Sequence, residues 1–259
     1  MKNLLASLSF TLLLMCCFSS GKSQVVGLDN WFNRETNQKT GKLFHYTWED
    51  TENGGFSQLG ELFIAKGAKL ETIGQKPDKG NLKGVGIYII VDPDTTTESK
   101  TPNYIMPDDI AIIKNWVKKG GVLLLMANDK PNCEFTHFNQ LAEVFGFHFV
   151  PLTLNPVLNR DWEMGAEKNL PGHPLFKGVS KIYMKEVAPV LLSKKAVPVL
   201  KDGNDIFMAE TAFGKGFVLA IGDPWIYNEY IDHKYLPASF ENLKAAQNMA
   251  GYLVQKTNR

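Results

Sequence analysis

Two short apolar runs constrain the fold of this chain more than any other feature. The runs are Val85–Val91 and Val122–Met126, and neither shows the polar face of a strand that is half exposed to water. Strands without a polar face are typical of parallel sheets, which helices cover on both sides. Between the runs, the spacing predicts a helix that opens at Pro107 and ends at Gly120-Gly121. The pattern therefore predicts parallel strands joined by a helical crossover.

The same alternation extends over the first half of the chain. Further strands are predicted at Val25–Leu28, Lys69–Ile73 and Phe147–Val150, and further helices through Phe56, Leu59 and Phe63, then through Phe138, Leu141 and Phe145. This β-α-β-α order predicts an α/β fold with a doubly wound, mostly parallel sheet and right-handed crossovers.

The second half changes character. Residues 151–180 are rich in proline and loops, and Val187–Leu200 and Ile206–Ala212 are predicted as short strands. A turn at Gly214-Lys215-Gly216 leads into the strand 217–221, and Ser239 is the expected cap of a final helix. We predict a single domain over residues 24–259 with a β-rich insertion in its second half.

The first 23 residues have the layout of a secretory signal peptide. A basic start at Lys2 precedes the apolar run Leu4–Phe18, and small polar residues follow up to Ser23. Cleavage after Ser23 predicts a periplasmic or secreted protein. The alternative, a lipid anchor on Cys16 or Cys17, lacks the small residue expected before the cysteine.

Composition excludes several classes of function. Without residues 1–23 the chain has 26 basic and 27 acidic residues, which is a net charge of −1. This balance indicates no nucleic-acid partner and no polybasic membrane patch. No other apolar run has the length of a transmembrane span. Cys133 is the only cysteine left, so no intramolecular disulfide can form, and we expect it to be a spectator thiol rather than a nucleophile.

Polar residues follow the predicted parallel strands at their carboxyl ends, where open α/β sheets bind ligands. Carboxylates and amides hydrogen-bond sugar hydroxyls, and indole rings pack on sugar C–H surfaces. The predicted ligand-binding residues are Asp29, Asn30, Trp31, Asn128, Asp129, Asp223, Trp225 and Asn228. The alternative remains open, because Asp and Asn also cap helices and form turns after strands.

A second polar cluster is the segment His45–Asp50, just before Asn53-Gly54-Gly55. Its aromatic rings and carboxylates suit a pocket, and the glycine pair could present N–H groups to an anion. An ordinary surface loop explains the same residues equally well.

Other motifs are absent from the sequence. The five histidines have no metal-ligand spacing, so no metal is predicted. Neither a G-x-S-x-G elbow nor a G-x-G-x-x-G fingerprint is present, and we expect no serine nucleophile and no cofactor.

Three segments carry a family resemblance: Gly120–Leu125, His173–Val179 and Gly214–Asp223. With the order of elements, they resemble the class I glutamine amidotransferase-like superfamily, and within it the uncharacterised trehalose-utilisation-like domains. The run Gly222–Asp232 resembles a segment of domains attached to unsaturated rhamnogalacturonyl hydrolases. The resemblance implies a flavodoxin-like α/β fold and a link to carbohydrate.

The chain also departs from that family. Where a glutaminase has its cysteine after the strand ending near Ala127, this chain has Asn128-Asp129. No His-x-Glu pair follows the last strand, so glutaminase activity is not expected. The hydrolases' (α/α) catalytic barrel cannot fit in a chain of this α/β pattern, so their catalytic carboxylates cannot be transferred.

Two functional hypotheses follow. The first is an exported carbohydrate-associated accessory or binding domain, linked to plant cell-wall oligosaccharides such as those of pectin and rhamnogalacturonan. The second is a hydrolase of glycosidic or ester bonds in which Asp223 works with Asp129 or Glu229 as acid and base. Carboxylates facing each other across a cleft would favour the hydrolase, whereas carboxylates buried in helix caps would favour the binding domain.

Overall fold

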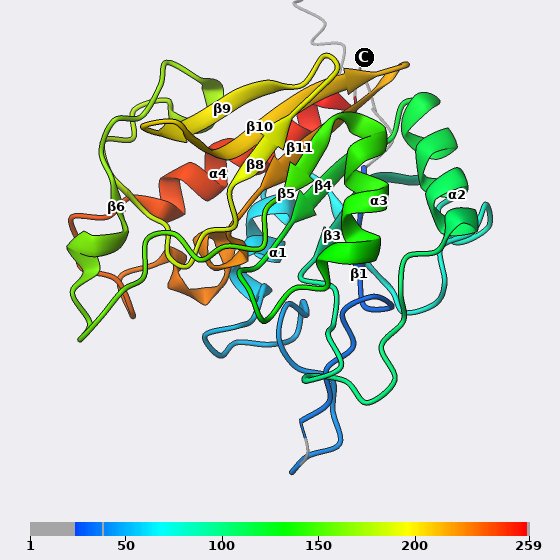
Figure 1. The fold of residues 1–259 in the computed structure, drawn as a ribbon, viewed down its shortest axis with the longest axis horizontal. Coiled ribbons are helices and arrows are strands. Elements are labelled where there is room, and N and C mark those ends of the chain that lie inside the picture. Colours follow the sequence, from blue (N-terminus) through cyan, green and yellow to red (C-terminus); the bar gives the residue numbers. More distant parts are fainter. Residues whose placement is uncertain (1–23, 38, 258–259) are drawn as a thin grey trace, which may run out of the picture.

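A seven-stranded sheet forms the centre of the molecule in the computed structural model, which describes residues 24–37 and 39–257 (Figure 1). Its order is β2-β1-β3-β4-β11-β10-β9. The strands are β1 Val25–Asp29, β2 Lys69–Ile73, β3 Val85–Val91, β4 Val122–Met126, β9 Val197–Asp202, β10 Asp205–Phe213 and β11 Gly216–Ile221. Strands β2, β1, β3, β4 and β11 are parallel, and β10 and β9 add to the edge in antiparallel fashion. The doubly wound, mostly parallel α/β fold is thus confirmed, in the strand order of flavodoxin-like proteins.

Helices cover both faces of the sheet and create two cores. The helices are α1 Ser57–Ile64, α2 Pro107–Lys118, α3 Phe135–Phe145 and α4 Asn242–Lys256. Successive residues of β3 alternate between the cores: Ile87 and Ile89 join the core with α1 and α4, and Tyr88 and Ile90 join the core with α2 and α3. Burial on both faces is the reason that β3 and β4 lack a polar stripe.

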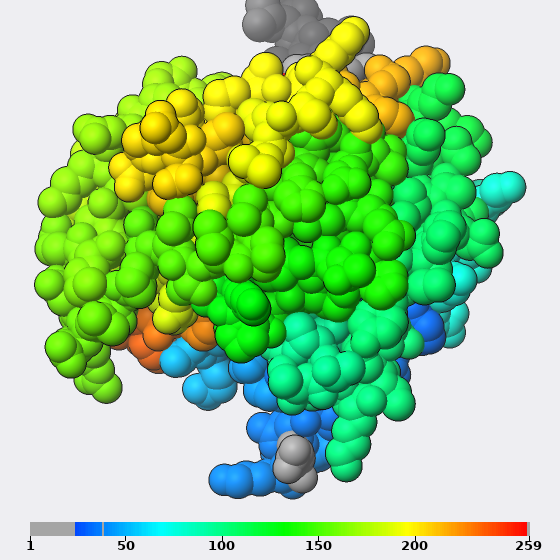
Figure 2. Space-filling view, viewed as in Figure 1, coloured from blue at the N-terminus to red at the C-terminus, as the bar shows by residue number. Residues whose placement is uncertain are grey.

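The second half of the chain returns to the sheet only after an excursion. It contains two small antiparallel pairs, β5 Phe147–Phe149 with β8 Val190–Leu192, and β6 Ala166–Glu167 with β7 Ile182–Tyr183. The 3₁₀ turns there are Trp162–Gly165 and Pro174–Phe176. This insertion forms the left side of the molecule in Figure 2, in yellow-green. After β11, two further 3₁₀ turns, Pro224–Tyr227 and Glu229–Ile231, lead to α4.

Two local expectations need correction. The strand expected at Phe147–Val150 forms, as β5, but it pairs with β8 outside the parallel sheet. Ser239 does not cap the last helix, because α4 begins at Asn242 with Glu241 at its N-cap. The side chain of Asn242 is fully buried and bonds both backbone polar groups of Tyr183, which fixes the first residue of α4 against β7.

The predicted signal peptide, with Cys16 and Cys17, lies outside the described residues. Within residues 24–37 and 39–257, no helix is both long enough and apolar enough to cross a membrane.

Candidate functional site

The carboxyl ends of the parallel strands face the long connection between β1 and α1. This connection, residues 30–56, is shown in blue at the bottom of Figure 1. The chain passes from β1 to β2 on one side and then crosses to β3 on the other. This reversal is the topological switch point, where doubly wound sheets bind ligands. In its described residues this connection has no helix or strand of its own, which is unusual for a segment of this length and is often functional.

This connection forms a pocket of about 660 Å³. Most of its lining residues lie between Asn37 and Gly54 in the described part of the connection, and Trp225, in the 3₁₀ turn after β11, also lines it. The pocket confirms that part of the segment His45–Asp50 faces a cavity. It also brings that segment together with Trp225, which lies far away in the sequence.

The backbone at the centre of this lining has a strained geometry. His45 and Tyr46 both have positive φ, 59° and 41°, which non-glycine residues adopt rarely. Tertiary contacts hold them there: the Tyr46 N–H donates to the Gly54 carbonyl at 2.7 Å, and the Tyr46 ring packs edge-on against Phe56 at 5.2 Å.

The glycine pair after this segment serves close packing. A Cβ on Gly54 would lie 2.6 Å from the His45 ring, and one on Gly55 would lie 1.9 Å from the Asp50 carbonyl oxygen. The Gly55 N–H donates to the Glu52 carbonyl at 2.8 Å, so this N–H is engaged inside the loop.

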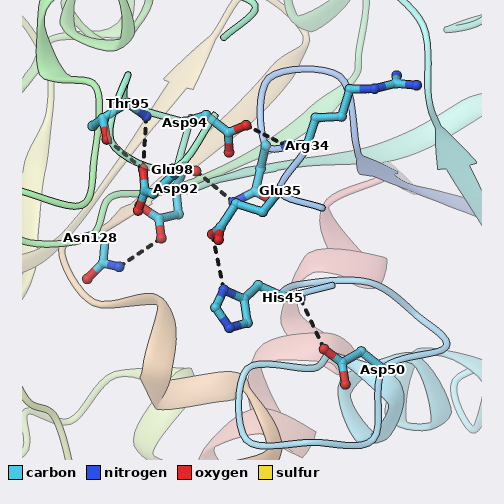
Figure 3. A network of polar contacts seen from close by, with 10 residues as sticks. Arg34, Glu35, His45, Asp50, Asp92, Asp94, Thr95, Glu98 and Asn128 are labelled. Carbon is cyan, nitrogen blue, oxygen red and sulfur yellow. Dashed lines mark hydrogen bonds and ion pairs between the residues drawn. The ribbon is translucent and has the colours of Figure 1, made fainter. Parts of the chain in front are cut away.

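An acidic network lies beside His45 (Figure 3). Nδ1 of His45 lies 3.0 Å from Oε1 of Glu35. Asp92, directly after β3, is buried and accepts a hydrogen bond from Asn128 at 2.7 Å. Asp94 accepts the Arg34 N–H at 3.0 Å. Burial raises the pKa of Asp92 well above its ordinary value, and that of Asp94 to about 7.

Glu98 completes this network. Its carboxylate accepts hydrogen bonds from both the backbone N–H and the hydroxyl of Thr95. Burial raises the pKa of Glu98 to about 6, and the nearby Glu35 adds to the shift. The switch point therefore carries four carboxyl groups that repel one another electrostatically. Within the described residues, no three His, Cys, Asp or Glu side chains come together as metal ligands.

At the end of β1, the predicted ligand residues support the local backbone. Asp29 is fully buried, accepts the Phe32 N–H at 2.7 Å and accepts the Tyr88 hydroxyl at 2.5 Å. Burial raises its pKa to about 7. The Asn30 amide donates to the backbone oxygen of Asp29 at 2.9 Å, and Trp31 packs against the core beside α2 and α3.

At the end of β4, Asn128 and Asp129 are also nearly buried. Besides its bond to Asp92, Asn128 accepts the Asp129 N–H at 2.9 Å. The two carboxylate oxygens of Asp129 accept bonds from Asn132, at 2.9 Å, and from the Thr153 hydroxyl, at 2.6 Å.

The residues after β11 are similarly engaged. Asp223 accepts the N–H groups of Trp225 and Lys185, at 2.7 and 2.9 Å. Burial raises its pKa to about 7. Asn228 accepts the Tyr230 N–H at 2.9 Å. Among the predicted ligand residues, Trp225 is the one that lines the pocket.

Glu229 holds the start of a helix that is distant in sequence. Its two carboxylate oxygens accept the Ser57 hydroxyl at 2.7 Å and the Gln58 side-chain amide at 2.6 Å. It also accepts the Gln58 backbone N–H at 3.1 Å, so it satisfies the first turn of α1, which has no cap from its own N-cap residue.

Replacing Glu229 by alanine should destabilise the protein by about 2–3 kcal/mol, because half-buried donors at the start of α1 lose a charged acceptor. Urea unfolding of the variant and the wild type measures this difference. Glu61→Ala, an exposed site on the same helix, should change the stability by less than about 0.5 kcal/mol. Equal effects of the two substitutions would contradict the assigned role of Glu229.

Sequence reasoning missed Glu35 and residues 37–44 of the lining. The only signal available was the length of the connection between the first strand and the first helix. Cys133 is buried, and burial raises the pKa of its thiol well above the ordinary value, which disfavours the reactive thiolate.

Comparison with known proteins identifies the fold. No family model and no curated protein matches this chain. Among solved structures, the mmIFT52 N-terminal domain is similar with a TM-score of 0.65 and 15% identity, covering 89% of this chain and 97% of that one. The cytoplasmic protein STM1381 from Salmonella typhimurium LT2 is similar with a TM-score of 0.58 and 14% identity, covering 90% and 98%.

A carbohydrate-active enzyme contains the same fold as one part. The exo-beta-1,4-mannosidase Op5Man5 from Opitutaceae bacterium strain TAV5 is similar with a TM-score of 0.53 and 13% identity. The match covers 88% of this chain but 36% of the mannosidase. At these identities the similarities show a shared α/β fold.

Proposed function

We propose that this protein is an exported carbohydrate-binding accessory protein whose ligand occupies the pocket at the carboxyl edge of the sheet. The observation that carries the proposal is the pocket of about 660 Å³ in which Trp225 lies together with amide, hydroxyl and carboxylate side chains. The volume is within the usual range for small-ligand sites. An indole with surrounding hydrogen-bonding groups suits a sugar, which has both C–H faces and hydroxyls.

Trp225 is positioned rather than loosely exposed. The Lys185 ammonium lies 4.0 Å from the centre of its ring, and Tyr230 packs edge-on at 5.5 Å. An aromatic ring that is fixed in advance loses little conformational entropy when a ligand packs on it. Its position therefore supports a binding role.

The similar structures give further support. Besides the mannosidase, the beta-galactosidase from Rahnella sp. R3 has a part of this fold, with a TM-score of 0.52 and 14% identity, over 90% of this chain and 31% of the enzyme. This chain corresponds to about a third of each enzyme. An accessory role beside carbohydrate-cleaving activity is consistent with that proportion.

The competing hypothesis of a carboxylate-dependent hydrolase has less support. Both carboxylate oxygens of Asp223, of Asp129 and of Glu229 accept hydrogen bonds from the protein itself. A general acid or base needs an oxygen that can reach the substrate. Carboxylates that stabilise turns and helix starts are those expected of a binding domain.

The finer proposal, a fragment of rhamnogalacturonan as ligand, rests on the resemblance of Gly222–Asp232. This segment includes Trp225 and continues into the 3₁₀ turn Glu229–Ile231. Export rests on the layout of residues 1–23. Detection of the protein, with its first residue at Gln24, in the periplasm or medium of its host would test export.

Calorimetric titration of residues 24–259 with plant cell-wall oligosaccharides tests the binding function. We expect binding to at least one pectic oligosaccharide, and Trp225→Ala should weaken it about tenfold or more, because a buried aromatic contact is lost. Trp116→Ala, on α2 outside this pocket, serves as the matched control and should leave the affinity unchanged.

Thermal denaturation of both variants confirms that each is folded at the temperature of titration. Absence of binding to every oligosaccharide offered would refute the function. Cleavage products from wild-type protein would instead favour the hydrolase.

A further inference from the structure

We propose that the pocket selects neutral or amino-bearing sugar residues and rejects uronates. This inference rests on the proposed carbohydrate-binding function and names the chemical class of sugar that the same site accepts. In a rhamnogalacturonan fragment, the pocket would hold a neutral rhamnose or galactose residue rather than a galacturonate.

The charges of the lining are unequal. Three carboxylates, Glu49, Asp50 and Glu52, line the pocket, and Lys42 is the one lysine or arginine among the lining residues that the structure describes. The side chains of Glu49 and Glu52 are exposed, so they can contact a ligand directly. Asp50 accepts the N–H groups of His45 and Glu52, at 3.0 and 2.9 Å, and its charge remains at the pocket wall.

A further carboxylate lies behind His45. Glu35 contacts its ring at 3.0 Å with a side chain that is only 12% exposed (Figure 3). A low-dielectric wall screens such a charge less than water does. Together with Glu49, Asp50 and Glu52, which outnumber Lys42 in the lining, it makes the potential inside the pocket negative.

Two lysines beyond the lining, one over Trp225 and one near Glu52, do not reverse this balance. Lys185 forms an ion pair with Glu186 at 2.9 Å while it lies over the Trp225 ring. Lys234 is exposed, lies over the ring of Tyr235 and is close enough to Glu52 for their charges to interact. Each lysine therefore has an acidic neighbour of its own.

Hydrogen-bonding capacity leads to the same conclusion. When the His45 ring is neutral, its hydrogen bond with Glu35 places the proton on Nδ1, so Nε2 is a hydrogen-bond acceptor. Figure 3 shows Nε2 turned away from Glu35. With the carboxylates, the pocket is rich in acceptors. Sugar hydroxyls and ammonium groups donate hydrogen bonds, whereas a uronate carboxylate only accepts them. The amide and hydroxyl side chains of the lining can bond either kind of sugar, but a uronate would also face three carboxylates of like charge, and this repulsion favours its rejection.

The test compares three oligosaccharides of equal length, built from galactose, galactosamine and galacturonate, by calorimetric titration of residues 24–259. At about 20 mM NaCl we expect the galacturonide to bind about tenfold more weakly than the galactoside, and the galactosamine compound to bind at least as tightly. At about 500 mM NaCl the differences should shrink, because salt screens the charges.

The double variant Glu49→Gln, Glu52→Gln should bring the galactoside and galacturonide affinities within about threefold of each other. Glu143→Gln, at an exposed site outside this pocket, is the control and should keep the wild-type preference. A galacturonide that binds as tightly as the galactoside would overturn the selectivity and leave the binding function standing. Failure of these three sugars and of the pectic oligosaccharides to bind would overturn the function itself and this inference with it.

Discussion

Unfolding of this protein should require more free energy at about pH 5 than at about pH 8. Burial raises the pKa of Asp29, Asp94 and Asp223 to about 7 in the folded state, from the ordinary value of 3.8. Between these values the folded protein binds more protons than the unfolded chain. The resulting stability is fully present below about pH 4 and is lost as the pH rises through about 7.

The expected effect is large, because one pKa unit corresponds to about 1.4 kcal/mol for each group. Hydrogen bonds from Lys168 and Lys181 lower the pKa of Glu163 from 4.5 to about 2. This group has the opposite effect, because its contribution to stability is lost as the pH falls, but that loss occurs below the pH range of the measurement. Measurements from about pH 5 upward therefore leave out the contribution of Glu163.

Urea unfolding at intervals between about pH 5 and pH 8 measures this dependence. In Asp29→Asn, the slope with pH should become shallower, because one of the carboxyl groups with a raised pKa is removed. Asp205→Asn, at an exposed site, should keep the wild-type slope. A stability that stays constant or increases with pH would show that these carboxyl groups are not shifted as described.

Gly222→Ala should destabilise the protein by about 3 kcal/mol or more. A Cβ at Gly222 would lie 1.9 Å from the backbone oxygen of Ala188. This contact cannot be relieved by a side-chain rotation, because the Ala188 N–H bonds the Gly222 carbonyl at 2.7 Å and the Gly222 N–H bonds Phe207 at 2.9 Å. Overpacking against fixed backbone is among the more damaging changes in a protein core.

Gly172→Ala is the matched control, because an added Cβ there would meet nothing within 4 Å. It should change the stability by less than about 0.5 kcal/mol. Thermal and urea unfolding of both variants at one pH provides the comparison. If Gly222→Ala unfolds at the same urea concentration as the control, the close approach of residues 188 and 222 is wrong.

The central strands could be predicted because their signal is local. The observed bounds of β2, β3 and β4 match the predicted ones, since an apolar run between turn residues has few alternatives in an α/β chain. The partner of β5 could not be predicted in this way. A three-residue strand carries no information about whether it joins a parallel sheet or pairs with β8.

In the candidate site, too, local features could be predicted from the sequence and long-range contacts could not. Asp and Asn after strands were visible in the sequence, but their hydrogen-bond partners lie far along the chain, as with Asp223 and Lys185 or Glu229 and Ser57. No local pattern distinguishes a carboxylate that supports a turn from one that binds a ligand. Trp225 shares that ambiguity, and only the position of the segment 37–54 places its ring beside a pocket.

The sequence by itself determined the α/β class, the alternation of strands and helices along the chain, and the edge of the sheet where polar residues collect. Periodicity and turn chemistry act over a few residues, so they can be recognised without a structure. The tertiary structure decided which of those polar groups are buried supports and which face a pocket. It also decided the positive φ angles of His45 and Tyr46, because contacts with Gly54, Phe56, Glu35 and Asp50 hold that strained backbone in place.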